Sequence, residues 1–323
     1  MTSLPDQRDR PVIGVVLVNW NGCDDTLAAL ESLLAADPGP ARVVVVDNGS
    51  EDDSVARLAA WGTDRGVDTV VRDGEPDVAQ TEAWLTIVRA GANLGFAGGN
   101  NLGLRHLRRC DVTHFLLLNN DATVASDYFA HLADALAAFP SAGLIGSLIF
   151  HHPDRDRVWY SGGYEVPWRA LVLHNYDVPA TRQPYRTEFV TGCAMLIARP
   201  LYEELGELPQ CYDPVYWEDG EYSRRTRLAG WDLVVAPAAR VYHKVRTTGG
   251  GGSVLTPRVA FLEIRNRTIY VRRNYRGADR AMALTYLAIT KPARALAEVL
   301  RGRPLVGSAI IRGYVRGLLT RTT

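Results

Sequence analysis

Short apolar runs that end in polar turns recur along the first half of the chain. Three of them are aliphatic or β-branched and are followed at once by Asn or Asp, and they span residues 12–18, 42–46 and 115–118. Between the first two, four leucines recur at helical spacing across residues 26–35, after an Asp pair that can cap a helix. Buried strands that alternate with helices indicate a parallel sheet whose strand ends share one edge.

The same patterns predict further elements. Before residue 151 we expect helices over about 53–60, from the Gly-rich segment 93–101 to Arg108, and over 126–138, with strands at 69–72, 84–89 and 143–150. From residue 151 to 198 the runs become shorter and richer in Pro and aromatic residues, with strands expected at 158–161, 171–175 and 187–197. A helix over 222–229, strands at 233–236 and 240–243, and a helical C-terminal extension complete the expected fold.

The composition is that of a globular protein. The 323 residues are 47% apolar and 22% charged, which is enough for a large core. Four scattered cysteines with no CxxC pair and no secretory leader predict neither disulfides nor a structural zinc site, and they favour the cytoplasm. No apolar run reaches the roughly 18 to 20 residues that cross a bilayer, so a soluble or peripheral protein is expected.

Positive charge is concentrated near the C-terminus. The formal net charge is zero, but from Arg265 to the end there are thirteen Arg or Lys against only Asp279 and Glu298. This basic region either packs on the core or lays an amphipathic face on anionic lipid, and the sequence leaves both open. Nucleic acid is a weaker partner, because no binding module is recognised and the overall charge is balanced.

Polar residues at the predicted strand ends form the candidate site. The run from Phe115 to Asp121 is an apolar strand that ends in an acid, which indicates either a ligand site or an Asx-turn. The Gly-rich segment 93–101 matches neither a dinucleotide fingerprint nor a P-loop. Such a segment allows the backbone to lie close to a bound group, which then faces the positive N-terminal end of the following helix. The alternative is a plain loop that leads into the helix.

Seven motifs in a fixed order resemble glycosyltransferase family 2. They are VNWNG at 18–22, VVDNGS at 45–50, NLGFAGGNN at 93–101, LLNND at 117–121, GCAML at 192–196, WED at 217–219 and the late His243. The resemblance runs from about residue 12 to 275 and implies the GT-A fold, a Rossmann-like, mostly parallel sheet flanked by helices. It also implies a nucleotide-diphospho-sugar donor, a divalent metal and inversion at the anomeric carbon. The LNND form is similar to the bacterial rhamnosyltransferase-like group.

The resemblance assigns donor-site roles to single residues. Asp121 would give a carboxylate to Mg²⁺ or Mn²⁺, and His243 is either a second ligand or a structural residue. Asn119 replaces the first acid of the family's Asp-x-Asp-like motif, which lowers the negative charge of the site. The residues that the resemblance places in contact with the base, ribose, sugar or diphosphate of the donor are Asn19, Asn21, Asp47, Asn93, Gly95, Asn119, Asn120, Gly192 and Arg265.

Direct displacement needs a carboxylate that takes the proton of the acceptor hydroxyl. Asp219 in the WED motif matches the family's base, and the alternative is that it only caps the following helix. Glu218 is the second-choice base, and Glu221 stands where many relatives have Asp. The Gln-x-x-Arg-Trp signature of processive members is absent after the base, so a non-processive enzyme is expected.

These inferences combine into one prediction. A transferase domain would span 1–255, with a nucleotide-binding half at about 11–150 and an acceptor half at about 151–255, followed by a basic helical region at 256–323. The segment TTGGGGS at 247–253 has the composition of a lid. The enzyme would use a dTDP- or UDP-sugar, with rhamnose as the leading sugar. The acceptor would be a polysaccharide, a lipid-linked sugar or a small molecule.

The cellular role follows from the acceptor. We expect assembly of cell-surface polysaccharide or glycolipid, in the cytoplasm or at the inner face of the membrane. The alternatives are tailoring of a secondary metabolite and a non-catalytic protein that binds sugar nucleotides.

Overall fold

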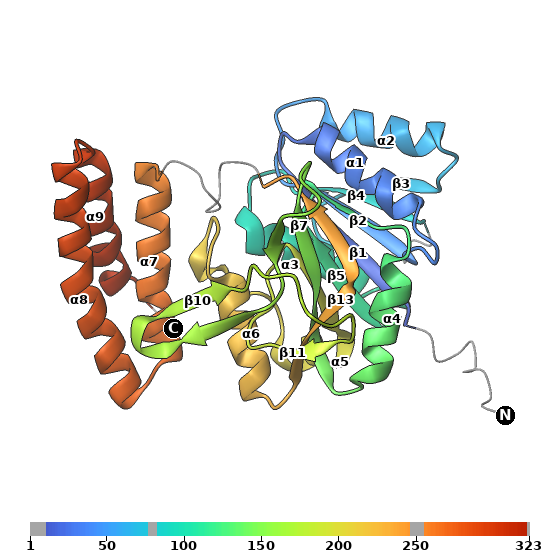
Figure 1. Cartoon of the computed structure of the whole chain (residues 1–323). Helices are drawn as coiled ribbons and strands as arrows, with labels where there is room; N and C mark the ends of the chain where they lie inside the picture. Colours follow the sequence, from blue (N-terminus) through green and yellow to red (C-terminus); the bar gives the residue numbers. More distant parts are fainter. Residues whose placement is uncertain (1–10, 77–82, 246–254, 322–323) are drawn as a thin grey trace.

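A computed structural model describes residues 11–76, 83–245 and 255–321 of the chain. Its centre is a twisted sheet with the strand order β11-β13-β7-β12-β5-β1-β2-β4-β3, and β6 and β8 pair with β13 and β7 (Figure 1). The strands are β1 Ile13–Asn19, β2 Arg42–Asp47, β3 Thr69–Asp73, β4 Leu85–Arg89, β5 His114–Leu118, β6 Ala122–Val124, β7 Ala142–His151, β8 Val158–Tyr160, β11 Tyr185–Arg186, β12 Ala194–Ala198 and β13 Asp232–His243.

The sheet is mostly parallel, as predicted. β1 pairs in parallel with β2 and β5, β4 pairs in parallel with β2 and β3, and β13 runs parallel to β7. β12 is antiparallel to both of its neighbours, β5 and β7. The parallel register sets Asn19 opposite Asp47, so the polar ends of β1 and β2 lie at the same edge.

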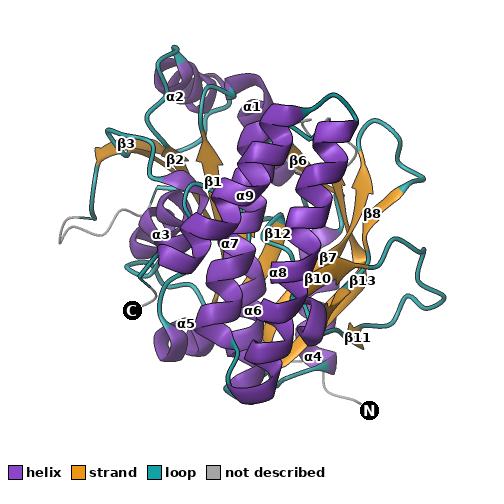
Figure 2. Ribbon diagram, turned by 90° about the vertical axis from the view of Figure 1, so that its left-hand side faces the viewer, coloured by secondary structure: helices purple, strands orange, loops and turns teal. Residues whose placement is uncertain are grey.

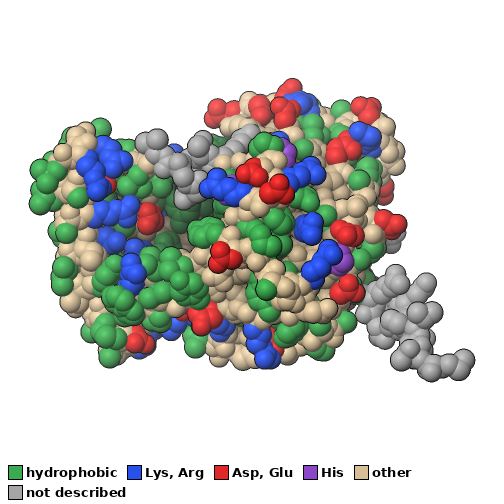
Figure 3. Space-filling view, in the orientation of Figure 1, with side chains coloured by type: hydrophobic (Ala, Val, Ile, Leu, Met, Phe, Trp, Pro, Cys, Tyr) green, Lys and Arg blue, Asp and Glu red, His purple; other side chains and the backbone are tan. Residues whose placement is uncertain are grey.

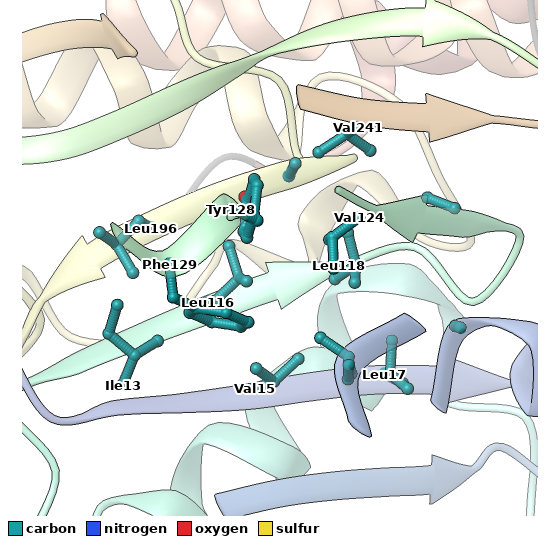
Figure 4. Close-up of a cluster of buried hydrophobic side chains, with 14 of the residues drawn as sticks. Ile13, Val15, Leu17, Leu116, Leu118, Val124, Tyr128, Phe129, Leu196 and Val241 are labelled. Atoms are coloured by element: carbon teal, nitrogen blue, oxygen red, sulfur yellow. The ribbon is translucent and has the colours of Figure 1, made fainter. Parts of the chain in front are cut away.

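Helices cover both faces of the sheet because alternate strand residues are apolar on either side. On β1, Val15 and Leu17 lie in the cluster covered by α1 and α4 (Figure 4). Val16 lies in the cluster covered by α3, on the other face. All three side chains are fully buried. The helices before residue 230 are α1 Cys23–Leu34, α2 Ser54–Asp64, α3 Gly95–Leu107, α4 Tyr128–Ala138, α5 Arg199–Leu205 and α6 Glu218–Leu228.

The glycines of α3 bring this helix close to the sheet. A Cβ atom at Gly103 would lie 2.4 Å from a methyl group of Val16, and one at Gly99 would lie 2.9 Å from Val18. The helix begins at Gly95, inside the segment that was expected to be its entry loop. Glycine is unfavourable in helices, so its presence here is explained by close helix–sheet packing.

Several boundaries differ from the prediction. The two strands expected at 233–236 and 240–243 are one strand, β13, with a register shift between Ala236 and Arg240. The strand expected from residue 187 begins at Ala194, and α6 begins at Glu218 rather than at residue 222. The short elements α5 and β6 were not predicted, because their periodic patterns are only a few residues long.

A hairpin and three helices lie beside the sheet. The hairpin consists of β9 Gly163–Val166 and β10 Leu171–His174, joined by the 3₁₀ turn η2 Pro167–Arg169. The helices α7 Pro257–Asn274, α8 Gly277–Leu300 and α9 Pro304–Leu319 lie side by side (Figure 2). Within the described residues, no helix is both long and apolar enough to cross a membrane.

Arginines of the basic region bind inside the protein. Arg272 donates to the carbonyl of Gly317 at 2.8 Å, and Arg273 forms an ion pair with the buried Glu221 at 3.0 Å. Arg267 is 3% exposed and donates to the carbonyl of Arg169. These residues therefore match the first of the two alternatives, packing of the basic region on the core.

Candidate active site

The ends of β1 and β2 form a buried polar network. Asn19 donates from its amide to the Asp47 carboxylate at 3.0 Å and to the Ser50 hydroxyl at 3.1 Å. The other carboxylate oxygen of Asp47 accepts the backbone N–H of Ser50. Asn19 and Asp47 are almost fully buried, and Asn21, with a positive φ of 49°, accepts the backbone N–H of Glu51. This network fixes the edge at which a nucleoside was predicted to bind.

Asn48 connects this edge to the N-terminus of α3. Its amide donates to the Asn93 side chain at 3.3 Å and to the Gly95 carbonyl at 3.1 Å, and its oxygen accepts the N–H of Leu94. Gly95 has a φ of +73°, and a Cβ there would lie 2.9 Å from the Asp213 carboxylate. The positive end of α3 is therefore held between β2 and the loop that precedes α6.

The side chain of Asp121, just beyond β5, contacts that of His243, at the end of β13. Their Oδ1 and Nε2 atoms are 3.0 Å apart, and both side chains are mostly buried. Burial lowers the pKa of His243, but its interactions with Cys193 and with the Asp121 carboxylate outweigh this effect and raise the pKa to about 10. The Nδ1 atom of His243 is buried without a hydrogen-bond partner in the described part of the chain.

The pair fits one side of a divalent-cation site. A carboxylate oxygen and a neutral imidazole nitrogen are ligands for Mn²⁺, so a cation would have to displace the proton that His243 shares with Asp121, and further ligands would come from a bound diphosphate. Across residues 11–76, 83–245 and 255–321 there is no cluster of three or more His, Cys, Asp or Glu that would hold a metal by itself.

The two asparagines before Asp121 face different ways. The Asn119 amide lies 3.4 Å from Nε2 of His243, and its backbone N–H donates to the carbonyl of Cys193. Asn120 instead donates to the Thr26 hydroxyl at 3.0 Å, and this hydroxyl donates to Asn19. Asn119 therefore belongs to the group around His243, and Asn120 connects the loop to the start of α1.

Asp219 lies at the start of α6, next to β12. Its carboxylate accepts the backbone N–H of Gly192 at 3.1 Å and that of Gly220 at 2.8 Å. The N-cap position of α6 is Trp217, so Asp219 is not the cap residue. A Cβ at Gly192 would lie 3.0 Å from the ring of Phe96 and 3.6 Å from the Cβ of Asp219, so a glycine leaves room for both side chains.

Glu218 and Asp219 differ in the charge they hold. Glu218 is 4% exposed, and burial together with the neighbouring Asp219 raises its pKa to about 8. Burial also raises the pKa of Asp219, while the Gly192 and Gly220 N–H groups favour its ionised form. Near neutral pH, Glu218 is therefore mainly protonated, and Asp219 is the better candidate for a carboxylate base.

Glu221 and Arg265 both join α7 to the rest of the site. Glu221 forms an ion pair with Arg273, accepts from Asn274 at 2.9 Å, and accepts the Tyr212 hydroxyl. Burial opposes its charge, but these partners keep its pKa below the ordinary value. Arg265 donates to the carbonyls of Tyr212 and Asp213. Both contacts position the loop before α6.

Comparisons with known proteins identify the family and the fold. The family model described as "Glycosyltransferase like family 2" matches residues 10–268. The chain belongs to this family. Glycosyltransferases of this family use nucleotide sugars, so the enzyme is a nucleotide-sugar transferase.

Two relatives show how far the sequence likeness extends. The enzyme is 26% identical over 266 residues to an N-acetylglucosaminyl-diphospho-decaprenol L-rhamnosyltransferase of Mycobacterium tuberculosis. This match covers 74% of this chain and 78% of the relative. It is 24% identical over 284 residues to an uncharacterised protein of Sinorhizobium fredii, which covers 83% of this chain. The match spans only 28% of the Sinorhizobium protein.

Solved structures confirm the GT-A fold. GalNAc-T7 with UDP, GalNAc and Mn²⁺ matches with a TM-score of 0.66 at 16% identity, covering 97% of this chain and 56% of that chain. A mannosyltransferase from Pyrobaculum calidifontis with GDP-Man and Mn²⁺ matches with a TM-score of 0.56 at 17% identity, covering 98% and 90%. The predicted family and fold are thus confirmed.

Sequence reasoning on this glycosyltransferase missed three neighbours of the site. Asn48 lies inside the VVDNGS motif but was not assigned a role, and Trp159 packs edge-on against His243 at a centroid distance of 4.8 Å. The Oδ1 atom of Asp213 is buried without a hydrogen-bond partner among the described residues, and burial raises the pKa of Asp213 to about 6. The segment TTGGGGS at 247–253 lies outside the described residues.

A separate surface hollow of about 720 Å³ is lined by residues 108–113 and by Arg199, Pro200 and Glu203. It lies at the amino end of β5, the opposite end from Asp121. It therefore does not belong to the candidate active site.

Proposed function

We propose that this glycosyltransferase moves a sugar from a nucleoside diphosphate sugar to an acceptor hydroxyl with inversion, one sugar per encounter. The observation that carries the proposal is the Asp219 carboxylate at the start of α6, which accepts the backbone N–H groups of Gly192 and Gly220. Asp121 lies just beyond the carboxyl end of β5, the strand next to β1, and its partner His243 ends β13. The arrangement supplies one acceptor-side base and one donor-side charged pair.

The reaction would be a direct displacement. The acceptor oxygen forms a bond to the anomeric carbon while the bond from that carbon to the diphosphate oxygen breaks. Asp219 takes the proton of the acceptor hydroxyl, and the Gly192 N–H group holds its carboxylate in position. Glu218 keeps its proton and therefore does not compete as a base near neutral pH.

Asp121 and His243 would hold a divalent cation, Mg²⁺ or Mn²⁺, in the donor complex. When bound, the cation neutralises negative charge that develops on the leaving diphosphate. Both solved neighbours contain Mn²⁺, which supports this assignment without separating the two metals. Asn119 lies beside His243 and would orient the donor through its amide.

On the donor side, Asp47 and Asn19 would contact the base or ribose, and Asn21, Asn93, Gly95, Asn120, Gly192 and Arg265 complete the proposed contact set. The leading donor is a dTDP- or UDP-sugar that carries rhamnose. The Mycobacterium relative is named for rhamnose transfer to a diphospho-decaprenol acceptor, and this supports rhamnose and a lipid-linked acceptor. The role would be glycolipid or polysaccharide assembly at the inner face of the membrane.

A panel of nucleotide sugars with Mn²⁺ and a prenyl-diphosphate-linked N-acetylglucosamine tests the proposal. We expect turnover with one donor, and NMR of the product should show an inverted anomeric centre. Retention of configuration would refute the displacement step. Binding of donor with neither transfer nor slow hydrolysis would instead support a non-catalytic sugar-nucleotide-binding protein.

A further inference from the structure

Four cations gather between the η2 turn and the helices α7 and α8. Arg267 of α7 and Lys291 of α8 are 3% and 4% exposed, and both interact electrostatically with Arg169 of η2 and Arg294 of α8. Glu263 is an acid that also acts on Lys291. Three positive side chains and this acid thus act on a nearly buried lysine.

Such a cluster is unfavourable for folding. Like charges that are removed from water repel one another, and burial together with the surrounding arginines lowers the pKa of Lys291 to about 8. The Nε atoms of Arg169 and Arg267 are buried without hydrogen-bond partners in the described part of the chain. Arg267 directs its terminal amino group to the backbone carbonyl of Arg169, at 2.6 Å. The site therefore has excess positive charge and unused donors.

The cluster adjoins the loop that leads to the proposed base. Asn266, next to Arg267, donates to the carbonyls of Val215 and Tyr216 at 2.8 and 3.0 Å. Glu263, which acts on Lys291, also acts on Tyr216. Tyr216 precedes Glu218 by two residues, so the same part of α7 contacts both the cationic cluster and the acceptor side of the active site.

Aromatic side chains lie beside the cations. The Arg169 guanidinium is 5.6 Å from the ring centre of Trp168 and 5.8 Å from that of Tyr286. Trp168 is 53% exposed. In Figure 3, Lys and Arg side chains form a column over the C-terminal helices, beside an apolar patch.

We propose that Arg169, Arg267, Lys291 and Arg294 bind the phosphate or diphosphate group of the acceptor. The inference rests on the proposed function and narrows its acceptor to a sugar linked through phosphate. Arginine forks and a lysine ammonium are the usual partners of phosphate oxygens, and a bound diphosphate would offset the excess positive charge. Trp168 offers an apolar face to the group that follows the phosphate.

Binding is tested on the full chain in EDTA and without donor, with farnesyl diphosphate as the probe and farnesol as the uncharged control. Isothermal titration calorimetry should detect the diphosphate and not the alcohol. Lys291→Met and Arg294→Gln should each weaken binding at least five-fold. The matched control is Arg312→Gln, an exposed arginine on α9, and it should bind like the wild type. EDTA removes the metal through which a diphosphate would bind beside Asp121 and His243.

Melting temperature separates a binding role from a structural one. Lys291→Met should melt no lower than the wild type, because it removes repulsion among buried cations. A clear drop in melting temperature, with unchanged affinity for farnesyl diphosphate, would overturn the proposal.

Vesicles distinguish the source of the phosphate. Phosphatidylglycerol vesicles should bind Lys291→Met as well as they bind the wild type. Loss of vesicle binding without loss of farnesyl diphosphate binding would assign the cluster to lipid headgroups and refute the acceptor site. Absence of transfer to any acceptor, with the predicted binding pattern intact, would refute the proposed function and leave the anion site standing.

Discussion

Replacing Asp219 by Asn removes one negative charge and leaves the size of the side chain almost unchanged. In the wild type, both carboxylate oxygens accept backbone N–H groups, one from Gly192 and one from Gly220. In the Asp219→Asn variant, the side-chain amide has a single oxygen and can accept only one of these two groups. The substitution therefore tests the base without emptying the space beside Phe96.

The expected change in stability is small. An N–H group that loses its acceptor in a buried place costs about 1–3 kcal/mol. Against this cost, removal of the Asp219 charge relieves the repulsion that helps raise the pKa of Glu218. The two effects oppose each other, and a loss of 1 kcal/mol lowers Tm by about 2–4 °C in a protein of this size class. We expect Tm to shift by no more than a few degrees.

The expected change in rate is large. A positioned general base contributes roughly 10²–10⁴-fold to turnover, or about 2.7–5.4 kcal/mol of the barrier. Because the base does not contact the donor, Asp219→Asn should leave the donor Kd within about three-fold. Single-turnover transfer at saturating donor and acceptor measures the rate, and calorimetry measures donor binding.

Glu218→Gln is the matched control. Glu218 has a pKa of about 8, so Gln resembles its main form at pH 7, and turnover should stay within about five-fold of the wild type. A folded Asp219→Asn enzyme with near-normal turnover would refute the reasoning. If Glu218→Gln were the inactive variant instead, the two roles would have to be exchanged.

Three further predictions concern the metal, the Gly192 turn and the charge on Glu218. Excess chelator and Asp121→Asn should each reduce transfer at least 100-fold, and full turnover in chelator would exclude a required metal. Gly192→Ala should slow turnover at least ten-fold with a modest loss of Tm, since its Cβ would lie 3.0 Å from Phe96; an unchanged rate would show that the turn adapts. The folded-state pKa of Glu218 lies above its ordinary value of 4.5, so wild-type stability should fall as pH rises from about 5 to about 8, and urea titrations should show a smaller fall in Glu218→Gln, in which Asp213 and Asp219 keep raised pKa values.

Much of the fold was predictable because its strands are buried on both faces. Continuous apolar runs such as residues 42–46 cannot lie at the surface, and each is followed by a polar turn at the same edge. That regularity also located Asn19, Asp47 and Asp121. The contact between Asp121 and His243 could be expected only from the resemblance, because 122 residues separate the two in sequence.

Other features depend on tertiary packing that a local pattern does not record. Gly99 and Gly103 would be poor helix residues in isolation, but they allow α3 to approach Val16 and Val18 of β1. Likewise, β13 continues past Pro237 because β7 pairs with it on both sides of this residue, and β6 also pairs with its last three residues. A reader of the sequence alone sees a Pro and places a break there.

The C-terminal basic region shows why counting charges was not sufficient. Glu221 and Arg273 are 52 residues apart, and their ion pair is 3.0 Å long with the Glu221 side chain 3% exposed. Glu221 lies two residues after Asp219 on α6, so α7 is attached directly to the helix that carries the proposed base. Breaking a buried pair leaves an uncompensated charge, which costs about 3–5 kcal/mol. The arginines for which a lipid surface was one of two alternatives therefore include a residue that holds α6, the helix of the proposed base, in place.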